Sequence, residues 1–359
     1  MEPKVVVVTG ANAGIGLSLA DRLLDEYRDV QLCLACRNKD RAETARRKLL
    51  RRHPGAQVSI VLVDVSSVKS VLKGAAEIRQ KFKHIDLLYL NAGIMKVSSI
   101  NIKKVLTIFH DFRREGAEIL STGKGVLNHI NNMTDEGLQE VFATNIFGHY
   151  VLVRELQDCC LGSPQSQIVW TSSQNAEAGV FNFQDIQHKH GKEPYSSSKH
   201  ATDILSVALN SRLNEKGVYS TVTCPGLVMS NIVFAILPAW FWWIVMPFLY
   251  FMRFFVPNLS CSAYNGAEAL IWVSKQRLAS LNPRIKYLSH CSVFGKRFIA
   301  EEKLHVSDDD ADSVYNELEK LYQGFKHQYE QANIIHSDQS FSGCLHNEQS
   351  KEQIANGWH

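Results

Sequence analysis

Two residues spaced one helical turn apart carry the main chemistry available to this chain. Tyr195 and Lys199 flank three serines, so in a helix the phenol and the ammonium share one face. A free tyrosine has a pKa of about 10, and a nearby ammonium stabilises the phenolate and lowers that pKa. Such a tyrosine acts as an acid when a carbonyl is reduced and as a base when an alcohol is oxidised. Ser173 follows an apolar run, where its hydroxyl could hold a substrate carbonyl.

A glycine-rich segment near the N-terminus predicts a dinucleotide site. It lies between the apolar run 5–8 and an amphipathic segment at 17–27. Glycine is favoured where the backbone turns sharply and where a pyrophosphate approaches the N–H groups that open a helix. A proton donor beside a nicotinamide site predicts redox chemistry between carbonyls and alcohols. The residues expected to bind the cofactor at this turn are Thr9, Gly10, Asn12, Gly14, Ile15 and Gly16.

The end of the second predicted strand indicates which dinucleotide is bound. A carboxylate there would accept hydrogen bonds from the adenosine 2′-hydroxyl, but the chain has Arg37, with further basic residues close behind. Arg37 could bind a 2′-phosphate through charge-assisted hydrogen bonds, which favours NADPH, and the alternative is a solvated basic loop. Asp64 could accept a hydrogen bond from the adenine amine. Asn91 ends the fourth predicted strand, beside small residues that could line the cofactor ribose.

These residues require a scaffold of strands that alternate with helices. Helical patterns at 17–27 and 41–52 separate the first three of six short apolar runs, which lie at 5–8, 31–36, 58–63, 87–90, 167–170 and 219–224. This alternation predicts an α/β fold of the Rossmann type, a doubly wound parallel sheet with helices on both faces. We expect one domain over residues 1–333 with an insertion at about 97–132. A terminal helix is expected over 308–331, followed by a polar, disordered tail at 334–359.

Composition excludes several other classes of protein. The net charge is +3 without a long basic block, which argues against nucleic-acid binding. The eight cysteines show no disulfide-scaffold spacing, so we expect a reducing compartment. Cys33 and Cys36 would point to opposite faces of a strand, which is a poor geometry for a metal or a redox pair. His188 and His190 have no further ligand cluster near them in the sequence, so no metal site is expected.

One segment argues against a wholly soluble protein. Residues 232–252 carry no charge and are about as long as the roughly 20 residues that cross a bilayer. They contain two prolines and three tryptophans, which suit a kinked element at a membrane interface. We favour an interface-embedded helical pair over a spanning helix or a buried helix or dimer contact. A span would separate the last core elements from the sheet, and no signal peptide precedes the first strand, so we expect a cytosolic catalytic domain.

Taken together, these motifs resemble the short-chain dehydrogenase/reductase family over about residues 4–300. The resemblance implies a catalytic set of Asn145, Ser173, Tyr195 and Lys199. It also implies that Lys199 binds the nicotinamide ribose and that Asn145 holds a proton-relay water. Near the carboxamide it implies Pro225, Gly226 and Ser230. The interval between Ser173 and Tyr195 is longer than is usual in the family, which leaves Ser172 as a competing assignment.

A narrower resemblance indicates the substrate. The segments 34–38, 89–95, 134–142 and 191–199 are similar to the branch of the family that reduces ketosteroids in sterol synthesis. This implies an NADPH-dependent reductase of a steroid or sterol ketone, at ring position 3 or 17, at the endoplasmic reticulum membrane. A homodimer is one option for its assembly. The alternatives are a reductase of another lipophilic carbonyl, such as a retinoid, and a membrane-associated scaffold protein. The complete catalytic set argues against the scaffold.

Overall fold

The computed structural model describes residues 3–100, 126–158, 165–228, 262–292 and 294–355, and the single residues 161, 247, 251 and 259. The chain divides into a compact first unit, residues 1–315, and a second unit, residues 316–359. The first unit contains the sheets described below. The second unit consists of the continuation of the last helix, α13 (Asp308–Ala355).

An eight-stranded sheet forms the centre of the first unit. Its order is β10-β9-β8-β7-β4-β1-β2-β3, and all neighbours are parallel except β9 and β10. The predicted doubly wound sheet is therefore confirmed, and its order reverses direction between β1 and β4, where open α/β sheets bind ligands. The bounds are β1 Lys4–Thr9, β2 Val30–Cys36, β3 Gln57–Leu62, β4 Leu87–Leu90, β7 Ser166–Thr171, β8 Val218–Cys224, β9 Ile285–Cys291 and β10 Arg297–Lys303.

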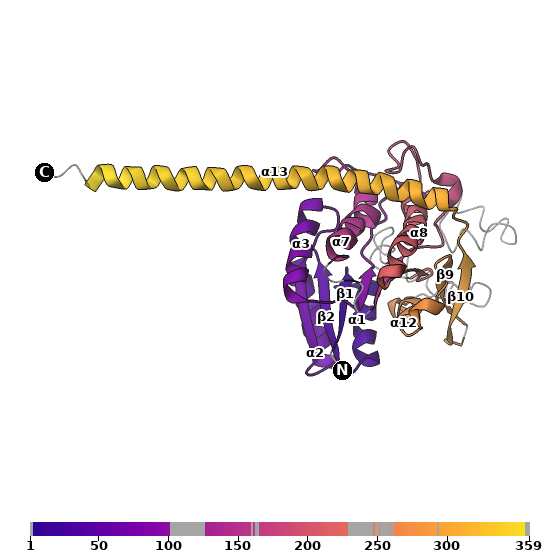
Figure 1. Cartoon of the computed structure of the whole chain (residues 1–359). Coiled ribbons are helices and arrows are strands. Elements are labelled where there is room, and N and C mark those ends of the chain that lie inside the picture. The colour runs from indigo at the N-terminus through magenta and orange to yellow at the C-terminus, as the bar shows by residue number, and fades with distance from the viewer. Residues whose placement is uncertain are drawn as a thin grey trace. The chain divides into compact units, whose positions relative to one another are not determined.

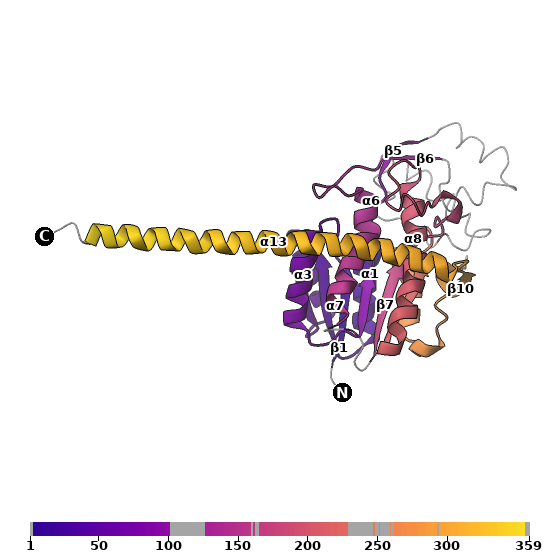
Figure 2. The same ribbon diagram turned by 45° about the horizontal axis from the view of Figure 1, so that its top comes forward.

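Helices cover both faces of this sheet. Figure 2 shows α3 (Val68–Lys81), α7 (Gly148–Leu156) and α8 (Pro194–Leu213) side by side along one face. The other face carries α1, which contacts α2, α11 and α12. The bounds of this second group are α1 Gly14–Glu26, α2 Lys39–Arg52, α11 Ala263–Gly266 and α12 Glu268–Ser274. In Figure 1, the colours follow the chain through these strands and helices, from indigo at β1 to orange at β10.

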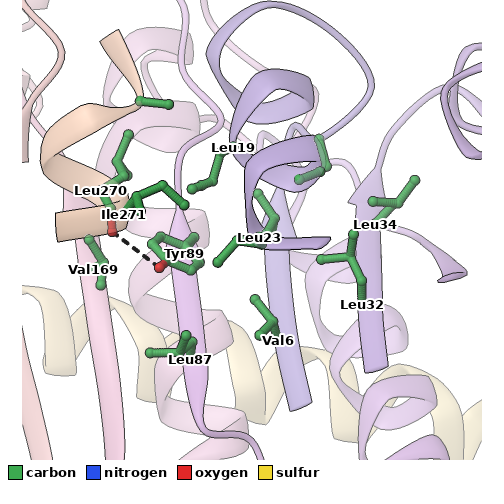
Figure 3. Close-up of a cluster of buried hydrophobic side chains, with 14 of the residues drawn as sticks. Val6, Leu19, Leu23, Leu32, Leu34, Leu87, Tyr89, Val169, Leu270 and Ile271 are labelled. Carbon is green, nitrogen blue, oxygen red and sulfur yellow. Dashed lines mark hydrogen bonds between the residues drawn. The ribbon is translucent and has the colours of Figure 1, made fainter. Parts of the chain in front are cut away.

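The core under α1 and α12 follows from the apolar runs of the sequence. Val6, Leu87 and Tyr89 point from the central strands toward Leu23 of α1 and Leu270 of α12 (Figure 3). The strands are buried on both faces, which is why their sequences are almost continuously apolar. Tyr89 is fully buried, and its hydroxyl donates a hydrogen bond to the Leu270 carbonyl at 3.2 Å, so its polar group is satisfied inside the core.

The predicted insertion begins and ends in a separate small sheet. β5 (Val97–Ile100) pairs antiparallel with β6 (Leu127–His129), and the residues between them lie outside the described residues. The terminal helix predicted over 308–331 forms the first part of α13. The structure continues α13 to Ala355, through residues for which the polar composition predicts disorder. Those residues include no proline and a single glycine before Ala355, so their backbone has no strong barrier to helical geometry.

Among the described helices, none has the length and apolar composition needed to cross a bilayer. The apolar run predicted to associate with a membrane, residues 232–252, lies outside the described residues apart from Pro247 and Phe251.

Candidate active site

A pocket opens at the carboxyl ends of β1, β2, β3 and β4, at the reversal point of the sheet. It is lined by the glycine-rich turn, by the ends of three strands and by Thr144. The lining residues are Gly10, Asn12, Ala13, Gly14, Ile15 and Gly16 from the turn, Ala35 in β2, Arg37, Asn38 and Arg41 between the end of β2 and the first turn of α2, Val63, Asp64 and Val65 after β3, and Asn91, Ala92, Gly93 and Ile94 after β4. Eight of the predicted cofactor residues lie in this wall: Gly10, Asn12, Gly14, Ile15, Gly16, Arg37, Asp64 and Asn91.

The three glycines of the turn are required for two different reasons. Gly10 and Gly14 have φ angles of +67° and +53°, in the left-handed region that favours glycine. Gly16 faces a close approach, because an added Cβ would lie 2.4 Å from the Gly10 carbonyl oxygen and 2.6 Å from Asn91 Nδ2. Since α1 begins at Gly14, its first N–H groups are directed toward the pocket, and this arrangement suits a pyrophosphate.

The basic side of the pocket carries two arginines. Arg37 is 71% exposed, and its guanidinium lies 3.6 Å from Asp64 Oδ2, so this ion pair is loose and screened by water. Asn38 caps α2 by accepting a hydrogen bond from the Arg41 N–H, and this cap places Arg41 in the pocket wall. Asp64 Oδ1 accepts hydrogen bonds from the backbone N–H and the hydroxyl of Ser66. The geometry leaves Arg37 available to a 2′-phosphate.

Thr9 plays a different role from the one that its place in the motif predicts. Its side chain is fully buried and does not line the pocket. Its hydroxyl oxygen accepts hydrogen bonds from the N–H groups of Asn91 at 2.9 Å and Ala92 at 3.0 Å, and it contacts His149 Nε2. Asn91 returns a bond from Nδ2 to the Thr9 carbonyl. Thr9 therefore holds the end of β4 against the end of β1, which fixes the pocket wall.

The predicted acid lies in the first turn of α8, beside the end of β7. Pro194 is the first residue of the helix, a position at which proline is favoured, and Tyr195 follows it. The Tyr195 phenol lies close to the Ser173 side chain, which lowers its pKa, but burial has the larger effect and raises that pKa to about 12. Ser172 instead donates to the Lys199 carbonyl at 3.4 Å and is almost wholly buried. The structure thus pairs Tyr195 with Ser173 and not with Ser172.

Lys199 lies beside Tyr195, but its electrostatic effect differs from the prediction. Its ammonium is 5.7 Å from the centre of the Tyr195 ring and donates to the Thr171 carbonyl at 2.7 Å. Burial lowers the pKa of Lys199 to about 8, opposed by the Asp203 carboxylate. For the Tyr195 phenol, desolvation is the largest influence, so its pKa is raised above its usual value.

Asn145 connects the cofactor pocket to the catalytic helix. It lies in a π-helical turn, Ala143–Phe147, before α7. Its side chain accepts from the Ile94 N–H at 2.8 Å and donates to the Ile94 carbonyl and, at 2.9 Å, to the Ser198 hydroxyl. A Cβ added to Gly93 in the pocket wall would lie 3.2 Å from Asn145 Oδ1 and 3.6 Å from Lys199 Nζ. Asn145 and Lys199 therefore lie immediately behind the wall where a nicotinamide ribose would bind.

The remaining predicted residues lie after β8. Pro225 and Gly226 follow Cys224 directly, and Gly226 has a φ angle of +69° and donates its N–H to Cys224 Sγ. Both stand at the same edge of the sheet as Ser173, which fits the predicted place near the carboxamide. Ser230 lies outside the described residues.

Several buried polar residues of this site are absent from the sequence prediction. His149 contacts Thr9, and burial lowers its pKa to about 3, so its imidazole is neutral. Asp203 and Lys286 form a buried ion pair at 2.8 Å, with side chains 2% and 1% exposed. The signal for them is a charged residue inside an otherwise apolar run, as in Ile-Lys-Tyr-Leu for Lys286.

Among the described residues, several other histidines and acidic groups have partners away from this site. His190 pairs with Asp185, while His188 accepts a hydrogen bond from the Glu193 N–H. Asp21, Asp25 and His53 lie close enough to share a metal ion, but Arg52 already forms ion pairs with both carboxylates. Cys33 and Cys36 are buried free thiols whose pKa values burial raises.

Comparisons with known proteins show which family and which individual proteins this chain is similar to. The family model for short chain dehydrogenase matches residues 4–112 and 115–238. The 3-keto-steroid reductase/17-beta-hydroxysteroid dehydrogenase 7 of Rattus norvegicus is 47% identical over 319 residues, covering 89% of this chain and 95% of that protein. The protein of the same name from Homo sapiens is also 47% identical, covering 89% and 93%. A 3-keto-steroid reductase of Schizosaccharomyces pombe is 27% identical, covering 90% and 97%.

Solved structures share the fold at lower identity. A short chain dehydrogenase from Burkholderia cenocepacia in complex with NADP has a TM-score of 0.54 at 17% identity, covering 79% of this chain and 94% of that one. Levodione reductase has a TM-score of 0.56 at 17% identity, covering 79% and 95%. The identities support likeness of fold alone.

Proposed function

Since the chain belongs to the short-chain dehydrogenase family, we propose that it is an NADPH-dependent reductase of 3-keto steroids that serves sterol biosynthesis. The observation that carries this proposal is the partly buried Tyr195 phenol beside Ser173 and Lys199, with Lys199 directly behind the Gly93 wall of a dinucleotide pocket. The steroid substrate rests on the names of relatives that are 47% identical over most of both chains. Those names also include 17-beta-hydroxysteroid dehydrogenase, so 17-keto steroids are a second class of substrate to test.

The pocket fits the proposed cofactor on its own geometry. Gly10, Gly14 and Gly16 line the pocket where α1 begins, so a pyrophosphate there would meet the first N–H groups of the helix. Arg37 and Arg41 present positive charge beside the position expected for the adenosine 2′-phosphate, where NADH would place a hydroxyl. When bound, NADPH supplies the hydride that adds to the ketone carbon.

The catalytic residues then manage the oxygen and its proton. The Ser173 hydroxyl and the Tyr195 phenol lie together, so both can hydrogen-bond to one ketone oxygen and orient it. Tyr195 donates its proton to that oxygen as the C–O double bond becomes a single bond. The Lys199 ammonium stabilises the resulting phenolate, and Asn145 lies behind the same wall, where it can hold the water that returns a proton.

The raised pKa of Tyr195 suits its role as the proton donor in ketone reduction. A general acid must hold its proton at the working pH, and burial keeps the phenol protonated far above neutrality. Alcohol oxidation needs the phenolate as a base, so the same residue serves both directions, and the concentrations of cofactor and substrate set the direction of net turnover.

The activity test is NADPH oxidation by the purified full chain in detergent. We would compare 3-keto sterols, 17-keto steroids and a retinoid aldehyde, with the Tyr195→Phe variant as a control for unspecific oxidation. The proposal expects the highest kcat/KM with the 3-keto sterols. A preference for the retinoid would overturn the substrate class, and NADPH binding without turnover of any carbonyl would favour the scaffold alternative.

We also propose that the protein attaches to the cytosolic face of the endoplasmic reticulum through residues 232–252. The support is the uncharged sequence of this run, with Pro238, Pro247 and three tryptophans, together with a sterol substrate that partitions into membranes. A kinked interfacial arrangement would leave both chain ends on the cytosolic side.

Protease protection of intact microsomes tests this topology. One tag is placed at the N-terminus and another after His359. The interfacial arrangement expects protease to remove both tags from outside, and a protected C-terminal tag would show a spanning helix instead. Sedimentation of the detergent-solubilised chain would show whether it forms the homodimer named above as one option.

A further inference from the structure

A buried lysine on β9 contacts the chain segments that carry the catalytic residues. Lys286 is 1% exposed, and its ammonium lies 2.8 Å from Asp203 Oδ2 and 3.2 Å from Glu302 Oε1. The same ammonium donates to the Ser173 carbonyl at 3.1 Å. Three acceptors therefore match the three N–H donors of one ammonium, which is the condition for keeping a charge in a protein core.

Two contacts of Lys286, with the Ser173 carbonyl and with Asp203, involve segments that carry catalytic residues. The Ser173 carbonyl belongs to the residue whose hydroxyl meets the Tyr195 phenol. Asp203 lies on α8 one turn after Lys199, so its contact with Lys286 ties the catalytic helix to β9. The Ser172 hydroxyl adds a bond to the Lys199 carbonyl, which joins the end of β7 to the same helix.

We propose that Lys286 is a positioning residue for the reduction: it holds the Ser173 backbone and Asp203 together, and thereby places the Ser173 hydroxyl and the Lys199 ammonium around the Tyr195 phenol. This inference rests on the proposed reductase function. It concerns a residue that would touch neither substrate nor cofactor and acts through Ser173 and Lys199.

The same contacts set the charge balance around Lys199. Asp203 raises the pKa of Lys199 and Lys286 lowers it, so the two members of the pair act in opposite directions. The other groups that face Lys199 are Cys224 on β8, Tyr195 on α8 and His149 on α7. Glu302 on β10 and Cys224 face Lys286. Loss of the Lys286 charge should therefore raise the pKa of Lys199, and loss of the Asp203 charge should lower it.

The experiment measures kcat and KM of the full-length enzyme against pH for four variants. Lys286→Met removes the ammonium, Asp203→Asn removes the carboxylate, and the double variant removes both. Lys303→Met is the matched control, because Lys303 is an exposed lysine on the neighbouring strand β10. The substrate is the carbonyl compound that gives the highest turnover with the unaltered chain.

We expect Lys286→Met to lower kcat by about tenfold to a hundredfold, the scale of a misplaced catalytic group, with little change in the KM for NADPH. The fall of activity at high pH should move to higher pH in Lys286→Met and to lower pH in Asp203→Asn. In the double variant, the pH at which activity falls should lie between the values of the two single variants. In Lys303→Met, both kcat and this pH should match those of the unaltered enzyme.

A folded Lys286→Met enzyme with unchanged kcat and an unchanged pH profile would overturn the inference. So would shifts of the same sign in both single variants, since a purely structural role has no reason to separate them. If Lys286→Met fails to fold, Lys286→Arg keeps the charge and should retain the pH profile. Asp203→Asn then still tests the direction in which the pH profile shifts. Failure of the unaltered chain to reduce any ketone would instead contradict the proposed function.

Discussion

The cofactor pocket and the catalytic corner lie at the same edge of one sheet, but they are built from different groups. The pocket uses backbone conformation, at Gly10, Gly14 and Gly16, and an exposed arginine, Arg37. The corner uses buried side chains, and there Lys199 and Lys286 are both almost fully desolvated. Screened charges act nearly independently, whereas desolvated charges couple to one another.

This difference separates binding from chemistry. Changes in the pocket should alter the affinity for NADPH and leave the proton chemistry intact. Changes in the corner should alter turnover and its pH dependence, and should affect NADPH binding much less.

The sharpest test of this separation is Tyr195→Phe. Loss of the general acid should lower kcat by at least about a hundredfold, because a positioned proton donor contributes on that scale. The Kd for NADPH should stay nearly constant, since the phenol does not line the pocket. Pre-steady-state turnover and fluorescence titration measure the two quantities. Unchanged turnover, under conditions in which chemistry limits the rate, would show that Tyr195 is not the acid.

Gly16→Ala tests the backbone side of the comparison. The new Cβ would meet the Gly10 carbonyl at 2.4 Å, so the turn must move. We expect a loss of about 1–3 kcal/mol in the free energy of unfolding, the usual range for overpacking, together with weaker NADPH binding. Urea denaturation checks the stability. Gly179→Ala is the control, because its added Cβ would meet nothing within 4 Å, and an equal loss in both variants would contradict the steric argument.

Arg37→Ala tests the charged side of the pocket. Removing a charge-assisted hydrogen bond to the 2′-phosphate should weaken NADPH binding by about tenfold or more, and should leave NADH binding nearly unchanged. Paired Kd measurements decide the question. Lys39→Ala serves as the control, because this neighbouring cation does not line the pocket. Equal losses for both cofactors would mean that Arg37 makes no contact with the phosphate.

The smallest expected effect is the pH dependence of the unaltered enzyme. Burial lowers the pKa of Lys199 to about 8, so its ammonium loses its proton as the pH rises through that value. If the ammonium stabilises the phenolate formed in reduction, kcat should fall above about pH 8. Tyr195 stays protonated there, because its pKa is raised to about 12. A rate that stays flat to pH 10 would show that the charge of Lys199 is not needed.

Much of the pocket could be predicted because its signals are local. Gly10 and Gly14 are needed for a turn within a few residues, and Arg37 follows the end of its strand directly. The role of Thr9 could not be predicted in the same way. Its hydroxyl accepts hydrogen bonds from the N–H groups of Asn91 and Ala92, which lie 82 and 83 positions further along the chain.

The sequence by itself determined the alternation of strands and helices, the glycine-rich turn and the spacing of Tyr195 and Lys199, because short-range periodicity and backbone sterics set all three. Only the tertiary structure decided that Ser173, and not Ser172, meets the Tyr195 phenol, since consecutive residues at a strand end point in different directions. It also decided that the Tyr195 pKa is raised and not lowered, and that Lys286 pairs with Asp203. Desolvation and ion pairing depend on which distant segments pack together, and that information is not local to any motif.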